Sequence, residues 1–242
     1  MIMKKVEFIT QDLLSKIYQQ SFEGNKLPNQ RDLADIYHVS RDTVQKALGR
    51  LTDMGLIRSV RGSGIFIKNA GRKNPLIYNS LTQNPYDRIR SETVFLKKIM
   101  ADENDCRIFG LKKPQPIWIF QRIRIVNFQI VQIETSKMPV ALFQDLTAAI
   151  IEHSVQEYVQ SAGFNISHYI TSYSPVLLDK SQAKLLQCKP HLPAMKIINR
   201  SLLDDGRVYE YSEVIALDYT CTYIVPFNKL SHAERQQKKA DR

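Results

Sequence analysis

The chain has 242 residues, 43% of them hydrophobic, and its 34 basic and 24 acidic side chains give a formal net charge of +10. Its length suits one large domain or two small ones, and its apolar content excludes a chain that is disordered throughout. It has no apolar run of membrane-span length, no secretory signal and no C-x-x-C pair among its three cysteines, which predicts a cytoplasmic protein without a membrane segment, a disulfide framework or a cysteine zinc site.

The first 68 residues predict three helices. Apolar residues recur at helical spacing over about residues 5–20, which indicates an amphipathic first helix. Asn29 followed by Asp32 is a weak capping pattern ahead of a second helix. Ser40 is a favourable N-cap for a third helix, which ends before Gly55. Four apolar residues form the buried face of this third helix: Val44, Ala47, Leu48 and Leu51.

The opposite face of the third helix is polar, and it carries Arg41, Asp42, Gln45, Lys46 and Gly49. A helix that enters the major groove of DNA does so with polar residues of its N-terminal half, which reach base edges and phosphates. The free N–H groups at the Ser40 end can also hold a phosphate. The third helix is therefore a candidate recognition helix.

Two short β-rich runs, residues 56–60 and 65–68, follow the third helix. The segment Arg61-Gly62-Ser63-Gly64 joins them, which predicts a hairpin with a basic tip whose small residues allow close approach to a ligand. Two helices across a short turn, followed by such a hairpin, make a winged helix-turn-helix. The alternative is a three-helix domain whose exposed charges have no partner.

The excess positive charge lies at the two ends of the chain. Residues 1–75 carry 13 Lys and Arg against 7 Asp and Glu, a net charge of +6, whereas residues 76–228 carry 16 against 15. This distribution suggests a polyanion-binding module attached to a neutral body. Charge alone leaves open a basic surface that is merely solvated.

The segment LPNQRDLADIYHVSRDTVQKALGRLTDMGLIRSVRGSGIFI resembles the winged helix-turn-helix of the GntR family of bacterial transcription regulators. The resemblance implies that Arg31, Ser40, Arg41 and Thr43 contact DNA and that Gly62 and Gly64 form a wing tip at the minor groove. Gln45 stands where the family usually has arginine, so a different base preference is expected. Together with the exposed polar residues, this predicts one DNA-binding set: Arg31, Ser40, Arg41, Thr43, Gln45, Lys46, Arg61, Gly62, Ser63 and Gly64.

Residues 69–85 are rich in Asn, Gly and Pro and lack periodicity, which predicts a linker. The expected organisation is a DNA-binding domain over residues 1–68, the linker, and a body over residues 86–228. Residues 229–242 form a basic tail that is expected to be disordered.

The body is expected to be α+β, a mostly antiparallel sheet with helices on it. Residues 89–100 fit either a helix or a strand. The full capping pattern of Ser154 and Glu157 predicts the start of a helix that ends near residue 162. The other expected elements are strands over 117–126, 130–136, 166–176, 195–203, 208–217 and 219–227, and helices over 140–152 and 179–188.

Several polar residues of the body are candidates for binding an anion. Arg122 and Arg124 share one strand face, beside a strand that carries Glu134, and two guanidiniums suit a phosphate or a carboxylate. Ser154 offers a hydroxyl at a helix start, and Glu210 offers an acceptor for sugar hydroxyls. The alternative is an ordinary cross-strand salt-bridge network, with Ser154 as a cap only.

The body resembles the UTRA effector-binding domain of the HutC subfamily of GntR regulators. The resemblance rests on R-I-R at 122–124 and on the segments IETSKMPVALFQDL, HSVQEYVQSAGFNI and VYEYSEV. It implies a chorismate-lyase-like fold and an effector pocket lined by Arg122, Arg124, Glu134, Ser154 and Glu210, with phosphosugars as frequent effectors. Gln156 replaces a common aromatic and Ala216 a common tyrosine, so one side of the pocket is expected to differ.

These features predict a transcription regulator, a repressor that a small-molecule effector, a phosphosugar, releases from a double-stranded DNA operator. A homodimer is expected because a two-fold symmetric operator has two half-sites, each of which binds one DNA-binding domain. The alternative is an enzyme on the chorismate-lyase-like body. The five histidines lack an H-E-x-x-H spacing, although His168 is expected near the pocket, and no cofactor or catalytic motif is present, so neither a metal, a cofactor nor catalysis is expected.

Overall fold

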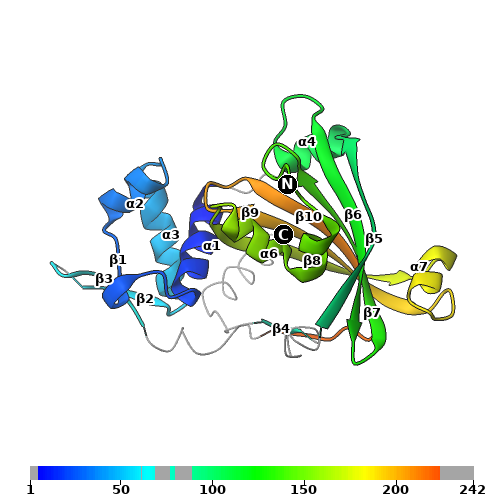
Figure 1. Cartoon of the computed structure of the whole chain (residues 1–242). Helices are drawn as coiled ribbons and strands as arrows, with labels where there is room; N and C mark the ends of the chain where they lie inside the picture. Colours follow the sequence, from blue (N-terminus) through cyan, green and yellow to red (C-terminus); the bar gives the residue numbers. More distant parts are fainter. Residues whose placement is uncertain (1–4, 61, 69–76, 80–88, 224–242) are drawn as a thin grey trace, which may run out of the picture.

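Residues 5–60, 62–68, 77–79 and 89–223 are described by the computed structural model, and they contain separate hydrophobic cores in an N-terminal head and a larger body (Figure 1). The buried hydrophobic residues of the head, among them Ile9, Leu13 and Leu51, form one core cluster within the first 67 residues. A second core under the body's helices contains Phe120, Phe143 and Tyr209. The predicted α+β class is confirmed.

The head has the predicted three helices and hairpin. The helices are α1 (Lys5–Tyr18), α2 (Gln30–Ile36) and α3 (Arg41–Asp53), and a short 3-10 turn, η1 (Glu23–Asn25), follows α1. A small sheet has the order β1-β3-β2, formed by β1 (Lys26–Leu27), β2 (Ile57–Val60) and β3 (Gly64–Ile67). This is the winged helix-turn-helix that the sequence predicts.

Local capping sets the boundaries of the two helix-turn-helix elements. The Asn29 side chain accepts hydrogen bonds from the backbone N–H groups of Arg31 and Asp32, and the Ser40 hydroxyl accepts one from Thr43 at 3.2 Å. Each bond satisfies an N–H group that a helix start otherwise leaves without a partner. A cap of this kind contributes about 1 kcal/mol, so the start of α3 is set by its own sequence.

The body is one antiparallel sheet of six strands in the order β5-β6-β7-β10-β9-β8. The segment that fits either a helix or a strand is the edge strand β5 (Ile89–Met100), which pairs with β6 along its whole length. Strand β4 (Ile77–Asn79) pairs with β11 (Cys221–Tyr223) apart from this sheet. The other strands of the large sheet are β6 (Pro116–Val126), β7 (Gln129–Pro139), β8 (Ile166–Leu177), β9 (Pro193–Leu203) and β10 (Val208–Ala216).

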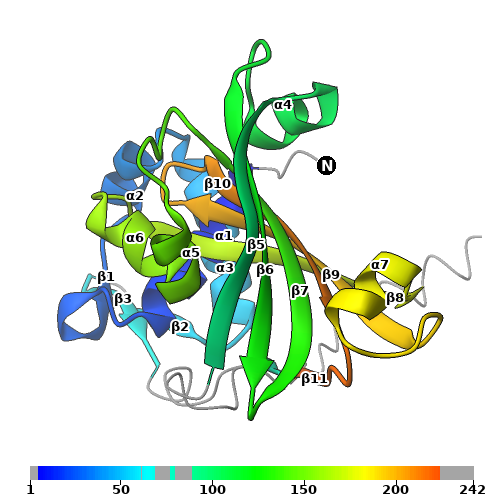
Figure 2. The same cartoon turned by 45° about the vertical axis from the view of Figure 1, so that its right-hand side comes forward.

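Helices lie on both faces of the large sheet. Helices α5 (Ala148–His153) and α6 (Val155–Ser161) cover the face that we name the inner face. Helix α7 (Lys180–Leu185) packs against the opposite, outer face through Ile133 and Ile215. The sequence did not predict α4 (Glu103–Phe109), which has a full capping box of Asp102 and Asp105 and joins the outer face through the 2.7 Å ion pair of Asp105 and Lys137. Figure 2 shows the outer face obliquely, between α4 and α7.

Two helix predictions need correction. The predicted helix over residues 140–152 begins only at Ala148, because the chain before it turns to bury Phe143, whose carbonyl accepts a hydrogen bond from the Trp118 indole at 2.6 Å. The predicted capping box at Ser154 is only half present: Ser154 accepts from the Glu157 N–H at 3.2 Å, but the Glu157 carboxylate lies 3.1 Å from His153. Of the predicted last strand, residues 224–227 lie outside the described residues.

The head contacts the body through α1 and the beginning of β8. The Asp12 carboxylate is fully buried and accepts hydrogen bonds from Tyr37 of the head and Ser167 of the body. Lys16, one helical turn further along α1, forms an ion pair with the same carboxylate, with 2.8 Å between its ammonium nitrogen and Asp12 Oδ2. The rings of Phe8 and His168 lie 5.5 Å apart, centroid to centroid. One strand of the body therefore touches the same buried carboxylate that joins α1 to the end of α2.

Candidate functional site

A cavity of about 550 Å³ lies between the inner face of the sheet and the junction of α5 and α6. Its lining includes all five residues that the sequence singled out in the body: Arg122, Arg124, Glu134, Ser154 and Glu210. They come from three strands and the start of one helix. Residues as far as 88 positions apart in the sequence therefore line the same cavity. The fold thus brings the predicted effector residues together.

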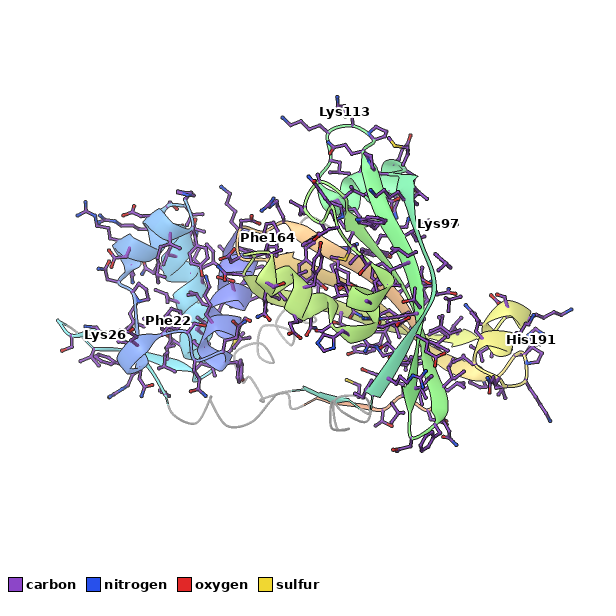
Figure 3. All side chains as sticks on the ribbon, in the orientation of Figure 1. Phe22, Lys26, Lys97, Lys113, Phe164 and His191 are labelled. Carbon is purple, nitrogen blue, oxygen red and sulfur yellow. The ribbon has the colours of Figure 1, made fainter. Side chains whose placement is uncertain are left out.

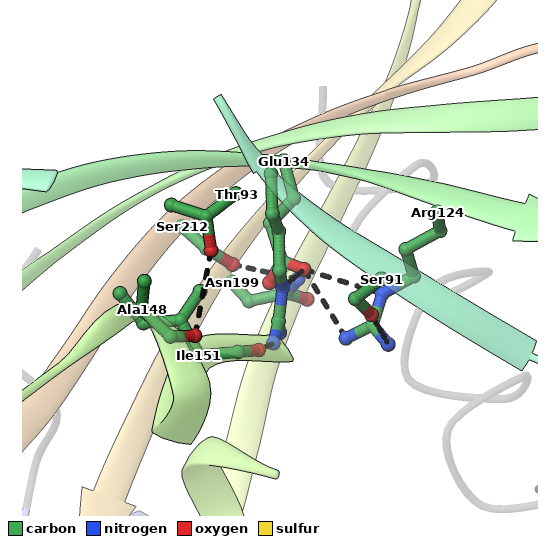
Figure 4. A network of polar contacts seen from close by, with 9 residues as sticks. Ser91, Thr93, Arg124, Glu134, Ala148, Ile151, Asn199 and Ser212 are labelled. Atoms are coloured by element: carbon green, nitrogen blue, oxygen red, sulfur yellow. Dashed lines mark hydrogen bonds and ion pairs between the residues drawn. The ribbon is translucent and has the colours of Figure 1, made fainter. Parts of the chain in front are cut away.

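The two arginines of the cavity share one carboxylate oxygen of Glu134 (Figure 4). Glu134 Oε2 accepts from Arg122 Nε at 2.7 Å and from Arg124 Nη2 at 3.2 Å. Arg122 also donates to the carbonyl of Ile151 at 2.6 Å, at the end of α5. Burial by itself raises the pKa of Glu134, but the two guanidiniums outweigh this effect and lower the pKa to about 2. The Glu134 carboxylate is therefore ionised at neutral pH.

The two arginines differ in what they can offer a ligand. The Arg122 side chain is 5% exposed and its short bonds fix Glu134 and the end of α5. The Arg124 side chain is 20% exposed, and its bonds to Glu134 and Ser91 are longer, at 3.2–3.5 Å. Arg124 is therefore the cation that an entering anion reaches more easily. Its guanidinium group can bind a carboxylate or a phosphate bidentately.

Glu210 is a second buried carboxyl of the cavity. It is 7% exposed, and its Oε1 atom has no hydrogen-bond partner among the residues that the structure describes. Burial raises its pKa, the charge of Glu134 raises it further, and Arg122 and Arg124 offset this only in part, so that the pKa is about 7. Near neutral pH this carboxyl can be protonated and donate a hydrogen bond, or be ionised and accept one.

The raised pKa of Glu210 predicts a pH-dependent stability. The folded protein binds this proton more tightly than the unfolded chain, whose glutamates titrate near 4.5, so the stabilisation is lost as pH rises from about 4.5 to 7. The loss is on the order of 3 kcal/mol for this group. We expect Glu210→Gln to remove this part of the pH dependence, so that the variant melts above the wild type at pH 8 but not at pH 5. Thermal melts at both values test this, and equal pH dependence of the two proteins would contradict it.

The rest of the cavity wall combines polar and aromatic side chains with apolar ones such as Ile197 and Val214. Alternate residues of β8 and β9 face it, and Asn199 joins the two neighbouring strands by bonding to Thr171 at 2.9 Å and to Ser212 at 3.2 Å. The sequence analysis missed these residues, although the period-2 spacing of hydroxyl side chains on β8 carried the signal. The missed lining residues include Ile89, His153, Val155, Tyr169, Thr171, Tyr173, Ile197, Asn199, Ser201, Ser212, Val214 and Tyr219.

The remaining expectations for the pocket have mixed outcomes. Gln156 lines the cavity, beside Ser154. Ala216 is 1% exposed and packs in a small core with Tyr173 and Tyr219, whose rings stack at 6.0 Å and give the wall an aromatic surface. His168, expected near the pocket, does not line it, because its ring packs on Phe8 of the head.

The predicted DNA-binding residues of α3 form an exposed surface. Arg31, Ser40, Arg41 and Gln45 are exposed, and Thr43 is half-buried, with its hydroxyl 2.8 Å from that of Ser40. Lys46 is also exposed but pairs with Asp42 at 2.6 Å, so the acidic residue near the recognition face is matched by a cation.

At the wing tip, Gly62 and Gly64 have φ values of 75° and 113°, in the region that favours glycine, and Ser63 between them is exposed. Arg61, also predicted to bind DNA, lies outside the described residues.

No helix within the described ranges has the length and apolar character to cross a membrane. Nor do the residues covered by the structure contain a group of three or more His, Cys, Asp or Glu side chains placed to hold a metal ion.

Comparisons with known proteins agree for both parts of the chain. Residues 5–67 match the family described as bacterial regulatory proteins, gntR family, and residues 86–216 match the UTRA domain. The chain is 29% identical over 195 residues to the mannosyl-D-glycerate transport/metabolism system repressor MngR of Escherichia coli (strain K12), covering 78% of this chain and 81% of that protein. It is 24% identical over 210 residues to the HTH-type transcriptional repressor NagR of Bacillus subtilis (strain 168), covering 85% and 86%. The crystal structure of a possible regulator, YydK of Bacillus subtilis, has the same fold, with a TM-score of 0.54 over 93% of this chain and all of that chain at 24% identity.

Proposed function

Since the chain belongs to the GntR family of bacterial regulatory proteins, with a UTRA domain as its body, we propose that it is a cytoplasmic repressor that a phosphosugar releases from its operator. As a family member it is a DNA-binding transcription regulator and not an enzyme. The observation that carries the proposal is the cavity of the body, in which the five residues singled out from the sequence meet.

The chemistry of the cavity supports a ligand with one anionic end and several hydroxyl groups. Arg124 supplies an accessible guanidinium for the anion, with the Ser154 hydroxyl on the same cavity. Asn199, Thr171 and Ser212 supply amide and hydroxyl groups, which pair with sugar hydroxyls. The name of the relative MngR refers to a sugar derivative of this general kind, mannosyl-D-glycerate.

Fluorescence anisotropy on DNA from the upstream region of its own gene tests this function. The protein is titrated onto labelled DNA, and a panel of phosphosugars and their unphosphorylated parents is then added. We expect salt-dependent binding and release by one phosphosugar but not by its parent. Binding that is indifferent to DNA sequence would contradict the regulator, and release by an uncharged parent alone would contradict the anion site.

We further propose the domain organisation that the sequence predicts: a reading head over residues 1–68, a linker over 69–85 and a body over 86–228. The two hydrophobic cores support the division. Of the linker, only residues 77–79 belong to the described part, and the tail over 229–242 lies outside it.

A homodimer is also part of the proposal, and the outer face of the sheet is the surface that suits a second copy. Between α4 and α7 this face presents the half-buried side chains of Ile119, Ile170 and Ile198, and no helix of the described residues crosses it in Figure 2. A half-buried apolar sheet face is more stable when another surface covers it. Light scattering is expected to give about twice the chain mass of 28.0 kDa, and the mass of one chain would contradict the dimer.

The contact of β8 with the head suggests how the cavity and the DNA surface are coupled. Ser167 bonds to the buried Asp12 of α1, and Tyr169, two residues further along β8, lines the cavity. A ligand that shifts β8 therefore acts on the strand that contacts the head. If the ligand lowers the affinity for the operator by some factor, operator binding must lower the affinity for the ligand by the same factor.

Ser167→Ala is expected to weaken this coupling without touching the cavity or the recognition surface. The drop in operator affinity that the effector causes should shrink by about 2- to 30-fold, while operator affinity without effector stays near that of the wild type. Hydrogen exchange of the α1 amides, which needs no effector, should become faster. Ser174→Ala, an exposed serine of the same strand, is the control. Unchanged exchange and unchanged release in Ser167→Ala would contradict the route through β8.

A further inference from the structure

The outward face of the wing sheet carries one cross-strand row that the sequence analysis did not single out. Lys26 of β1 lies opposite Phe66 of β3, and Phe66 lies opposite Arg58 of β2. The ammonium of Lys26 is 5.7 Å from the centre of the Phe66 ring, and the guanidinium of Arg58 is 5.9 Å from it. Cations within about 6 Å of an aromatic face are attracted to it. One ring thus holds two cations in a line across all three strands.

Both cations are exposed, and neither forms an ion pair with an acidic side chain of the described residues. This distinguishes them from Lys16, which pairs with the buried Asp12, and from Lys46, which pairs with Asp42. Lys26 and Arg58 lie on the two strands that flank β3, where their like charges repel each other across the Phe66 ring, and no ion pair with a carboxylate of the described residues relieves this repulsion. The arrangement is stabilised when a polyanion lies over the row.

The Lys26 side chain points along the wing toward its tip. A Cβ atom placed on Gly64 would lie 2.7 Å from Lys26 Cε, so the absence of a side chain at position 64 gives the lysine its path. Gly64 is the first residue of β3, directly after the wing tip at Gly62 and Ser63. Figure 3 shows Lys26 on the side of the head that is away from the body. Its ammonium therefore lies close to the part of the wing that approaches DNA.

We propose that Lys26 and Arg58, aligned by the Phe66 ring, bind the phosphate backbone of DNA beside the wing tip. The ligand is a phosphate group of either strand and not a base, because the two cations sit on a sheet face that is too broad to enter the minor groove, about 6 Å wide. Phosphate contacts of this kind position a protein on the duplex and add affinity that does not depend on sequence.

The alternative is that the row has only a structural role on the surface of the sheet. Lys26 and Arg58 would then shield the Phe66 ring from water with their aliphatic stems, as long charged side chains often do. This alternative predicts a loss of stability of the head on substitution, but no change in how DNA affinity depends on salt. The proposal and this alternative therefore predict different slopes of log DNA affinity against log salt concentration.

The test is the salt dependence of DNA affinity for the full chain, measured by anisotropy on upstream DNA and on a duplex of random sequence. Each lost phosphate contact lowers the slope of log affinity against log salt by about 0.9. We expect Lys26→Gln and Arg58→Gln each to lower it by about 1, and the double variant by about 2, on both duplexes. Lys113→Gln, an exposed lysine of the body (Figure 3), is the control and should leave the slope unchanged.

A third variant separates the ring from the charges. Phe66→Leu keeps both cations and an apolar side chain, so it should weaken affinity on both duplexes by a few-fold with little change in slope. A double variant that melts like the wild type and keeps the wild-type slope would overturn the proposal. A selective loss on upstream DNA, with random DNA unaffected, would also overturn it, because it would assign the row to base reading. Use of random DNA keeps this test independent of the operator and the effector.

Discussion

Arg41→Ala is expected to abolish operator binding under conditions where the wild type is saturated, with the fold of the head intact. Arg41 is the first residue of α3, directly after the Ser40 cap, and it is exposed. No acidic side chain of the described residues pairs with it. A single arginine contact with a base is worth about 1–3 kcal/mol, and the loss of a phosphate contact adds to it, so the affinity should fall by about 10- to 100-fold or more.

Anisotropy at one fixed salt concentration measures this effect, and circular dichroism with a thermal melt verifies that the head remains folded. Arg50→Ala is the matched control, because Arg50 is an exposed arginine in the last turn of the same helix, away from its N-terminal half. We expect this control to bind within a few-fold of the wild type. If Arg41→Ala binds as the wild type does, α3 is not the recognition helix.

Arg124→Ala is expected to remove the response to the effector and to leave operator binding intact. Arg124 lies in the body, and its guanidinium is the more accessible of the two in the cavity. Hydrogen bonds to charged groups contribute about 1.5–3 kcal/mol, so loss of the arginine should weaken effector binding by about 10- to 150-fold. The operator should then stay bound at effector concentrations that release the wild type completely.

The substitution leaves Glu134 bonded to Arg122 at 2.7 Å, so the buried carboxylate keeps one cation and the body is expected to fold. Arg107→Ala, an exposed arginine of α4, is the control and should respond to the effector like the wild type. Binding of the effector itself, measured by calorimetry, separates lost affinity from lost coupling. A normal response of Arg124→Ala would show that the anion site is elsewhere in the protein.

Much of the head could be predicted from the sequence because its structure depends on local interactions. Asn29 and Ser40 cap the helices that follow them, and the apolar face of α3 repeats at helical spacing. The glycines of the wing tip have the positive φ values that only glycine adopts readily. In these places the residue that specifies the structure and the structure it specifies lie within a few positions of each other.

The body shows where local patterns are insufficient. The segment over 89–100 became a strand because β6 offers it a full set of backbone partners, which its own pattern did not reveal. The helix expected over 140–152 lost its first half because burial of Phe143 and its bond to Trp118, 25 positions away, outweigh the helix propensity of the segment. Both outcomes depend on contacts between segments that are distant in the sequence.

For the candidate site too, some features could be predicted from the sequence and others depend on the tertiary structure. The sequence by itself determined a winged helix-turn-helix with an exposed polar face on its third helix, an antiparallel α+β body, and five polar residues as candidates for a binding site. Only the tertiary structure decided that these five line one cavity, that Arg124 is more accessible than Arg122, and that Glu210 is buried with one oxygen atom that has no hydrogen-bond partner among the described residues. It also decided that β8 joins the cavity wall to Asp12 of the head. The physical reason is that burial, charge pairing and pKa depend on which side chains meet in space, whereas caps, turns and periodicity depend on neighbours along the chain.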